Sequence, residues 1–195
     1  MDGKWIIGID EVGRGPLAGP VVVGAVLVPS NFDFRLVKGV RDSKKLTPNV
    51  REDWYEKILS FEKNTGMRHI VSTSSALIID TRGIVEAVAR GIRRCLERLK
   101  IEPHECDVRL DGAIYAPRRF INQRTIIRGD ESEPIISLAS IAAKVHRDRL
   151  MSKCARVHPE YGFERHKGYG TPLHYTAIRD FGTIPLVHRT TFLKE

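Results

Sequence analysis

The start of the chain carries the pattern that most restricts the fold: two short apolar runs joined by a glycine-rich turn. Residues 4–10 read as a buried strand, and residues 20–28 form a second β-branched run bounded by prolines. β-Branched residues favour strands, and a short glycine-containing link between two such runs is typical of an antiparallel pair. The chain therefore opens with a strand pair, whose first strand ends in two adjacent acids, Asp10 and Glu11.

Strands and helices alternate after this pair. A helix is expected from about Leu46, with Thr47 as its cap and Pro48 in its first turn, because apolar residues then recur every three or four positions. The helix predicted at residues 83–100 should bury an apolar stripe that begins at Val85. Other patterns predict strands at residues 69–74, 107–111 and 124–127, and a helix at residues 135–151. This order favours a mixed-sheet α/β or α+β fold, and residues 1–195 are expected to form a single domain because no repeat or linker divides them.

Composition indicates the kind of partner. The 195 residues include 32 Lys and Arg against 24 Asp and Glu, a formal charge of +8, which favours a polyanion such as nucleic acid. The longest uncharged stretch, residues 16–32, holds three prolines and cannot be a membrane-spanning helix. The first ten residues have no apolar segment of secretory-signal length, and the three cysteines are far apart in the sequence. We therefore expect a cytoplasmic protein without membrane association.

Four acids stand out because each lies at or just beyond the end of a predicted strand. They are Asp10, Glu11, Asp111 and Asp130. Carboxylates gathered at one edge of a sheet repel one another unless cations neutralise them, and hard oxygen ligands suit Mg²⁺ or Mn²⁺. The alternative is that these acids only form turns or cap helices, which is common at strand ends.

The glycine-rich turn at residues 13–20 contains the pattern G-x-G-x-x-A. A dinucleotide-binding fingerprint must open a helix, whereas prolines and a β-branched run follow here, so cofactor binding is disfavoured. Two interpretations remain. The turn could let a nucleic-acid strand approach the backbone closely beside Arg14, or it could be a tight turn with a solvated arginine.

Three further segments carry chemistry-bearing side chains. The charged run at residues 42–45 is either a phosphate clamp or a solvated charge cluster. Residues 166–170 combine cationic groups and a tyrosine between glycines, a composition suited to contact with a nucleic-acid backbone and sugar. Asp148 lies in a strongly basic helical stretch and is by default an ion-pairing acid.

Six blocks of the sequence, in order, resemble the signature blocks of the type 2 ribonucleases H, the ribonuclease HII family. They are residues 8–21, 42–46, 110–112, 128–130, 139–145 with 147–148, and 166–171. The resemblance implies a ribonuclease H-like fold, an α/β architecture with a central mixed five-stranded sheet flanked by helices. It also implies a metal-dependent endonuclease that cuts the RNA strand of RNA/DNA hybrids. Incision 5′ of single ribonucleotides embedded in duplex DNA, leaving 5′-phosphate and 3′-hydroxyl ends, follows from the same resemblance.

Carried over residue by residue, the metal-binding acids of this family fall on the same four strand-end acids, with two Mg²⁺ or Mn²⁺ ions expected during catalysis. Recognition of the ribose 2′-hydroxyl would fall to the glycine-rich turn and a tyrosine, and phosphate binding to a lysine pair. The residues assigned to substrate contact in this way are Gly13, Arg14, Gly15, Lys44, Lys45 and Tyr169, with Asp148, His166 and Lys167 in supporting positions.

Departures from the family pattern are small. Arg128 stands where lysine is common, which keeps the charge. Because no extra DNA-binding platform precedes the first strand, the type 3 enzymes are disfavoured. We expect a monomer. No clamp-binding tail is evident, and association with a sliding clamp or RNA polymerase is left open. Two other functions stay open at this point: a non-catalytic nucleic-acid-binding module, and a different two-metal nuclease that cuts all-DNA junctions.

Overall fold

The computed structural model describes residues 4–40 and 46–193. Five strands form one mixed sheet in the order β3-β2-β1-β4-β5. They are β1 (Trp5–Val12), β2 (Val21–Pro29), β3 (Arg68–Ser74), β4 (Cys106–Asp111) and β5 (Gln123–Ile126). The first three strands form an antiparallel meander, whereas β4 is parallel to β1 and β5 is parallel to β4. The expected strand pair and the expected mixed five-stranded sheet are both confirmed.

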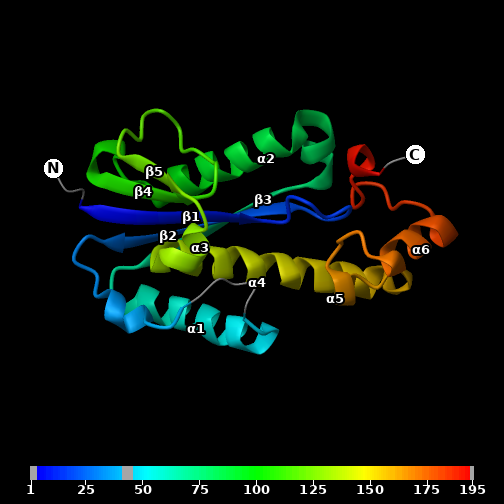
Figure 1. Cartoon of the computed structure of the whole chain (residues 1–195), viewed down its shortest axis with the longest axis horizontal. Coiled ribbons are helices and arrows are strands. Elements are labelled where there is room, and N and C mark those ends of the chain that lie inside the picture. The colour runs from blue at the N-terminus through cyan, green and yellow to red at the C-terminus, as the bar shows by residue number, and fades with distance from the viewer. Residues whose placement is uncertain (1–3, 41–45, 194–195) are drawn as a thin grey trace.

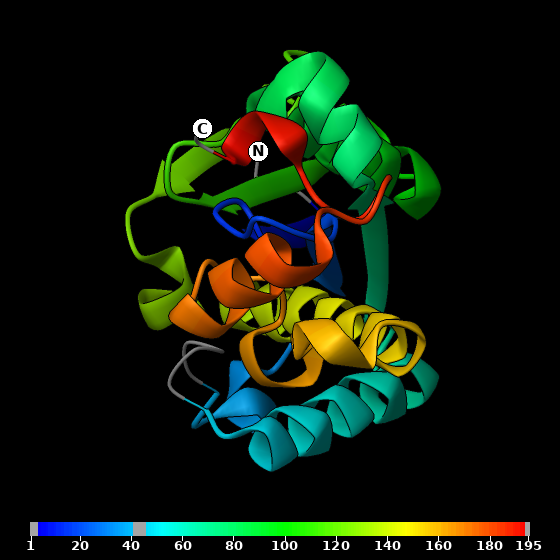
Figure 2. The ribbon, with the colours of Figure 1, turned by 90° about the vertical axis from the view of Figure 1, so that its right-hand side faces the viewer.

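Helices cover both faces of this sheet (Figure 1). They are α1 (Pro48–Asn64), α2 (Ala76–Leu99), α3 (Gly129–Ser132), α4 (Pro134–Val157), α5 (Phe163–His166) and α6 (Pro172–Phe181). The α2 helix packs on one face, α4 packs on the other, and α1 lies outside α4. Seen from one end, α5, α6 and the C-terminal segment lie across the end of the sheet (Figure 2). Within residues 4–40 and 46–193, none of the helices has the length and apolarity needed to span a membrane.

Alternation along β1 divides the core into two layers. Ile7 and Ile9 pack with α2, whereas Ile6 packs with α1 and α4, because successive side chains of a strand point to opposite faces. Both layers consist mainly of buried aliphatic side chains. The central strand is therefore covered on both sides, and its C-terminal end is held in a fixed position.

The α1 helix begins as predicted. The Thr47 hydroxyl accepts a hydrogen bond from the Val50 amide, and Pro48 occupies the first helical position, where its missing N–H is not needed. The buried side chains Trp54 and Ile58 form the inner stripe of the helix.

The α2 helix begins earlier than the sequence predicts. Ser75 caps it, accepting a hydrogen bond from the Ile78 amide, and the helix continues across a kink at Gly83, where φ is 80°. The predicted stripe is wrong at Val85, which is 71% exposed. The left-handed backbone at Gly83 changes the direction of the chain, so the buried side of the following segment begins at Ala87 and Val88 instead.

Two glycines allow α4 to lie directly on the sheet. A Cβ atom on Gly8 would lie 2.4 Å from the backbone oxygen of Ile135, and one on Gly24 would lie 2.3 Å from that of Ala139. Both distances are shorter than any tolerable contact with a backbone atom. The small residues of α4, including Ala142 and Ala143, are buried in the same layer. This close approach brings α4 against the carboxylate end of β1.

Candidate active site

Three carboxylates from distant parts of the chain meet at one end of the central strands. Asp10 lies in β1, Asp111 is the last residue of β4, and Asp130 lies in α3, shortly after β5. The parallel register pairs Ile9 with Leu110, which places the next residue of each strand side by side. Ligand oxygens of the three carboxylates lie within 4.8 Å of one another. Three of the four strand-end acids therefore converge on one point.

Asp10 has the most buried position of the three. Its residue is 4% exposed, and its Oδ1 accepts a hydrogen bond of 2.7 Å from the Glu11 amide. Burial raises the pKa of the Asp10 carboxyl well above its usual value, the negative charge of Glu11 raises it further, and a hydrogen bond from Ser140 of α4 opposes the rise. A buried carboxylate among like charges is stabilised by a bound cation or by a proton.

The short helix α3 fixes the other two acids. The backbone amides of Gly129 and Asp130 donate to Oδ1 of Asp111, at 2.7 and 3.4 Å. Glycine is needed at position 129, because a Cβ atom there would lie 2.6 Å from Cδ1 of Ile136 in α4. The hydroxyl of Ser137 in α4 donates to the backbone oxygen of Asp130 at 2.8 Å. Backbone amides thus hold the Asp111 carboxylate, and α4 holds the backbone of Asp130.

Glu11 lies beside this group and offers a free oxygen. Its Oε1 accepts a hydrogen bond of 3.1 Å from Arg14, whereas its Oε2 is buried without a hydrogen-bond partner among the described residues. Burial raises the pKa of the Glu11 carboxyl, the Arg14 guanidinium lowers it, and the charge of Asp111 raises it. A buried, unsatisfied carboxylate oxygen is rare because it costs about 1–3 kcal/mol. The all-oxygen donor set and this orphan atom together fit a hard divalent cation such as Mg²⁺ or Mn²⁺.

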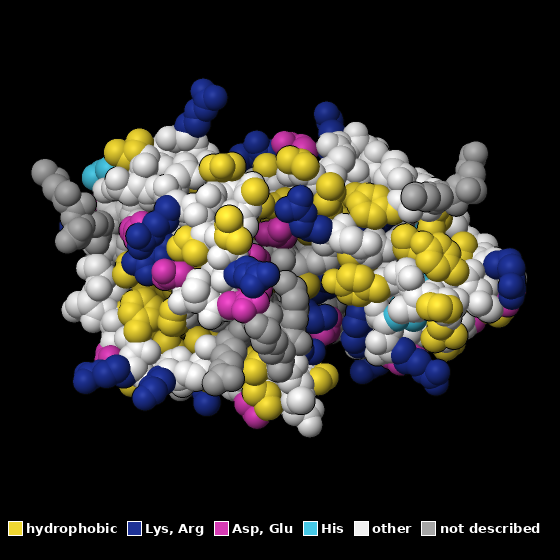
Figure 3. Space-filling model, in the orientation of Figure 1, with side chains coloured by type: hydrophobic (Ala, Val, Ile, Leu, Met, Phe, Trp, Pro, Cys, Tyr) yellow, Lys and Arg dark blue, Asp and Glu magenta, His cyan; other side chains and the backbone are white. Residues whose placement is uncertain are grey.

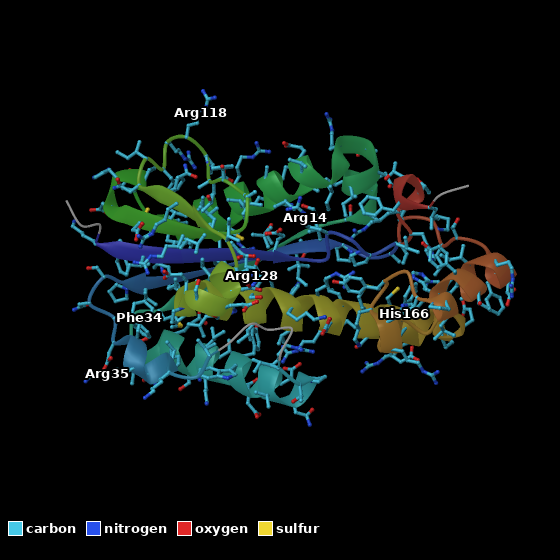
Figure 4. The ribbon with its side chains drawn as sticks, in the orientation of Figure 1. Arg14, Phe34, Arg35, Arg118, Arg128 and His166 are labelled. Atoms are coloured by element: carbon cyan, nitrogen blue, oxygen red, sulfur yellow. The ribbon has the colours of Figure 1, made fainter. Side chains whose placement is uncertain are left out.

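The glycine-rich turn follows directly after these acids, between β1 and β2. The strand β2 follows the turn, whereas a dinucleotide-binding fingerprint would be followed by a helix. Gly13 adopts φ 92°, and a Cβ atom there would lie 2.3 Å from Nε of Arg147. Gly15 has open space where a Cβ atom would stand, and the Arg14 side chain is about half exposed. Arg14 and Arg128 both lie near the middle of the molecule, Arg128 just ahead of α3 (Figure 4).

The segment that carries Tyr169 is bonded to this turn. The amides of Leu17 and Ala18 both donate to the backbone oxygen of Gly168, at 2.9 and 3.2 Å. The side chain of Tyr169 is exposed, at 42%, while its backbone oxygen contacts Nδ1 of His174 at 2.9 Å. The structure therefore brings Tyr169 to the same side of the molecule as the glycine-rich turn.

The other sequence-predicted residues differ in their surroundings. His166 is buried, and its ring nitrogens contact the Tyr161 oxygen and the Gly168 amide, so it holds the Tyr169 segment in shape. Lys167 donates to the Ser152 hydroxyl at 2.9 Å. Lys44 and Lys45 lie outside the described residues.

Asp148 makes the ion pairs that its basic surroundings predict. It accepts from Lys144 at 2.7 Å and lies 3.6 Å from Arg51. These residues line a groove of about 590 Å³ between α1, α4 and α5, and most of its charged side chains are basic. The face shown in Figure 3 is hollowed beside the C-terminal lobe, and Lys, Arg and acidic side chains lie in the hollow. A groove with excess positive charge attracts phosphates.

Three residues to which the sequence analysis assigned no role belong to the site. Ser140 contacts Asp10, and Arg147 and Arg189 lie fully buried beneath the glycine-rich turn. Ser140 lies within the run of small residues in α4, a pattern that predicts only close packing of a helix against the sheet. The sequence predicts that the two arginines are exposed, because no pattern in the neighbouring residues indicates that they are buried.

Comparison with known proteins gives one consistent result. The family model for Ribonuclease HII matches residues 7–195. A curated relative from Caldicellulosiruptor bescii, called Ribonuclease HII, is 41% identical over 192 residues, which cover 98% of this chain and 88% of the relative. The crystal structure of the ribonuclease H2 from Pyrococcus horikoshii OT3 is similar, with a TM-score of 0.76 and 28% identity over 96% of this chain and 93% of that one. A chain of the PCNA:RNase HII complex from Archaeoglobus fulgidus has a TM-score of 0.76 and 26% identity, over 97% of this chain and 96% of that one.

Proposed function

The chain belongs to the ribonuclease HII family and is a metal-dependent ribonuclease H, and from this premise we propose which substrates it cuts and which residues act. The substrates are the RNA strand of RNA/DNA hybrids and duplex DNA that contains a single ribonucleotide, incised on the 5′ side of the ribose. The observation that supports this most is the position of the carboxylate cluster directly beside the glycine-rich turn. A reaction centre and a backbone surface able to contact a sugar closely lie within a few residues of each other.

We assign metal binding to Asp10, Asp111 and Asp130, whose oxygens converge, and to Glu11 through its orphan Oε2. Bound Mg²⁺ or Mn²⁺ would supply an activated water as nucleophile and would stabilise the charge on the departing 3′ oxygen. The protein's own contribution is to fix the carboxylates in place. The backbone amides of Gly129 and Asp130 hold Asp111, and Ser140 holds Asp10.

Recognition of the ribonucleotide is assigned to the turn and to Tyr169. The 2′-hydroxyl is the only group that distinguishes ribose from deoxyribose at the cleavage site, and a donor or acceptor on the protein must reach it closely. Gly15 allows that approach, because open space lies where its Cβ atom would stand, whereas Gly13 makes room for Arg147 beneath the turn. The exposed Tyr169 ring can lie against the neighbouring sugar. Arg14 is accessible to the flanking phosphate.

The direct test is cleavage of a labelled DNA duplex containing one ribonucleotide, with Mg²⁺, with Mn²⁺ and with EDTA, beside an all-DNA duplex of the same sequence. We expect cleavage of the ribonucleotide duplex alone, only with metal, and on the 5′ side of the ribose. Products should carry a 5′-phosphate and a 3′-hydroxyl. Cleavage of all-DNA junctions would instead indicate a different two-metal nuclease, and binding without cutting would indicate a non-catalytic module.

Substitution Tyr169→Ala should reduce cleavage at a single ribonucleotide more than cleavage of a long RNA/DNA hybrid. A single ribonucleotide offers one register, in which the ring must contact the correct sugar, whereas a long hybrid offers many. We expect the ratio of the two kcat/KM values to fall about tenfold, as for the loss of one well-placed contact in the transition state. Phe181→Ala, which removes an exposed aromatic ring from the last residue of α6, is the control and should leave this ratio unchanged. Equal losses on both substrates would count against a junction-reading role for Tyr169.

A further inference from the structure

Two arginines are entirely buried beneath the glycine-rich turn. Arg147 and Arg189 each have 0% exposure and are the largest fully buried side chains among the described residues. Neither guanidinium can touch a substrate. Figure 2 shows the C-terminal segment that carries Arg189 running beside the turn that follows β1.

Every hydrogen bond that the two guanidinium groups make among the described residues goes to a backbone carbonyl. Arg189 donates to Gly13 at 2.7 Å, to Arg14 at 2.9 Å and to Gly19 at 2.9 Å. Arg147 donates to the backbone oxygens of Ala18, Pro20 and Lys167, at 3.1, 3.0 and 2.9 Å. The two side chains therefore hold both ends of the turn and connect it to the segment that carries Tyr169.

This arrangement is costly, because the ion pairs of the described residues include neither guanidinium. Burial lowers the pKa of both groups, that of Arg189 to about 9, and the charge of Arg147 contributes to the shift at Arg189. Two like charges buried side by side do not stabilise a fold by mutual attraction. The geometry that the two guanidinium groups impose on the turn explains their presence better than a contribution to stability does.

The geometry imposed by Arg189 follows from the planarity of the peptide bond. In a trans peptide the N–H points opposite to the C=O, and the described chain contains no cis peptide. Because Arg189 binds the Gly13 and Arg14 carbonyls from inside the protein, the amides of Arg14 and Gly15 point away from it. The hydrogen bonds of the described residues use neither of these amides. Two adjacent donors are left directed outward from the turn.

We propose that Arg189 is a positioning residue, which aims the Arg14 and Gly15 amides at the sugar oxygens of the ribonucleotide. Arg147 supports it by fixing the distance between the turn and Tyr169, whose ring lies 5.8 Å from the Arg147 guanidinium carbon. This inference rests on the proposed function, since it explains how that site reads a ribose. It places the determinant of specificity about 175 residues away in sequence from the amides that it orients.

The C-terminal segment is itself anchored so that Arg189 stays in place. The Arg189 amide donates to the Leu17 oxygen at 2.8 Å, and the Gly19 amide donates to the Val187 oxygen at 2.8 Å. Asp80 of α2 accepts from the amides and hydroxyls of Thr190 and Thr191, at distances from 2.6 to 3.1 Å. The turn, the C-terminal segment and α2 therefore form one connected unit.

The test is Arg189→Lys, which keeps the charge but cannot reach three carbonyls with a planar fork. We expect the ratio of kcat/KM on a single-ribonucleotide duplex to kcat/KM on a long RNA/DNA hybrid to fall by about tenfold or more, the range found when supporting partners of a site are lost. Ile58→Ala is the control, because it weakens the core near α1, away from the turn. It should lower the melting temperature while leaving the ratio unchanged.

A second variant keeps the test decisive if Arg189→Lys does not fold. Asp80→Asn loosens the anchor of the C-terminal segment without touching the turn, and it should lower the same ratio in the same direction by a smaller factor. If Arg189→Lys folds and its kcat/KM ratio is unchanged, the positioning role is overturned. If only Asp80→Asn folds, an unchanged ratio in that variant has the same meaning. Failure of the wild-type protein to cut the single-ribonucleotide duplex would instead overturn the proposed function, so the two failures are distinguishable.

Discussion

Replacing Asp10 by Asn is expected to abolish strand cleavage and to leave binding of an RNA/DNA hybrid largely intact. Asn has the same shape as Asp but lacks the negative charge, so the cluster with Asp111 and Asp130 loses its most buried carboxylate. A bound metal supplies several kcal/mol of transition-state stabilisation, and each 1.4 kcal/mol changes the rate about tenfold. We therefore expect the cleavage rate at millimolar Mg²⁺ to fall by at least about a thousandfold, measured with labelled duplex under single-turnover conditions.

The same variant should be more stable than the wild-type protein when divalent metal is removed. The Asp10 carboxyl has a raised pKa in the folded state because of burial and the Glu11 charge, so its ionised form at neutral pH opposes folding. Removing that charge relieves the penalty. Added Mg²⁺ or Mn²⁺ should raise the melting temperature of the wild-type protein by mass action, and Asp10→Asn should lose most of this rise.

Asp107→Asn is the matched control for this experiment. Asp107 lies at the start of β4 and pairs with Arg109 and Arg124, away from the carboxylate cluster. The control makes the same chemical change and should leave both cleavage and the metal-dependent rise in melting temperature unaltered. If the Asp10→Asn variant cleaves at the wild-type rate at ordinary Mg²⁺ concentrations, Asp10 is not a metal ligand.

Substitution Gly8→Ala should destabilise the fold more than a change of one methyl group ordinarily does. The added Cβ atom would lie 2.4 Å from the Ile135 backbone oxygen, so α4 or β1 must move. Overpacking against backbone costs more than overpacking against a flexible side chain, and we expect a loss of about 3 kcal/mol in the free energy of unfolding. For a chain of this length that corresponds to a drop in melting temperature of about 10 °C.

Gly15→Ala provides the comparison, because no atom lies within 4 Å of the position of its added Cβ and its backbone requires no left-handed conformation. Its free energy of unfolding should change by no more than about 0.5 kcal/mol. Chemical denaturation of both variants measures the difference. Similar stability of Gly8→Ala and the wild-type protein would mean that α4 does not pack against the sheet as closely as the structure shows.

Much of the sheet and part of the site could be predicted from local patterns. The β-branched runs predict β1 and β2 because their burial on both faces needs no information from elsewhere in the chain. The strand-end acids could be singled out for the same reason, and Asp10, Asp111 and Asp130 do converge. The substrate and the role of the turn, which spacing alone leaves open, are implied by the resemblance to ribonuclease HII.

Other features depend on tertiary packing that a pattern does not reveal. Val85 fits an apolar stripe, but the kink at Gly83 turns it outward. Arg147 and Arg189 have charged side chains that normally remain in solvent. Their burial is tolerable because they donate to backbone carbonyls far away in the sequence, mostly those of the turn. The four-residue helix α5 is too brief to show periodicity. The expectations of a single domain and of a monomer stay predictions.

Because β1 pairs in parallel with β4, the active site can form only late in folding. Asp10 and Asp111 become neighbours only after a chain segment of about one hundred residues has closed into a loop, and such non-local contacts form slowly. Asp130 and Arg189 join still later along the chain. A molecule in which β1 and β4 are not paired therefore has no assembled carboxylate cluster, and metal affinity should report the completion of the sheet. Metal-dependent cleavage is therefore expected only once these two distant strands lie side by side.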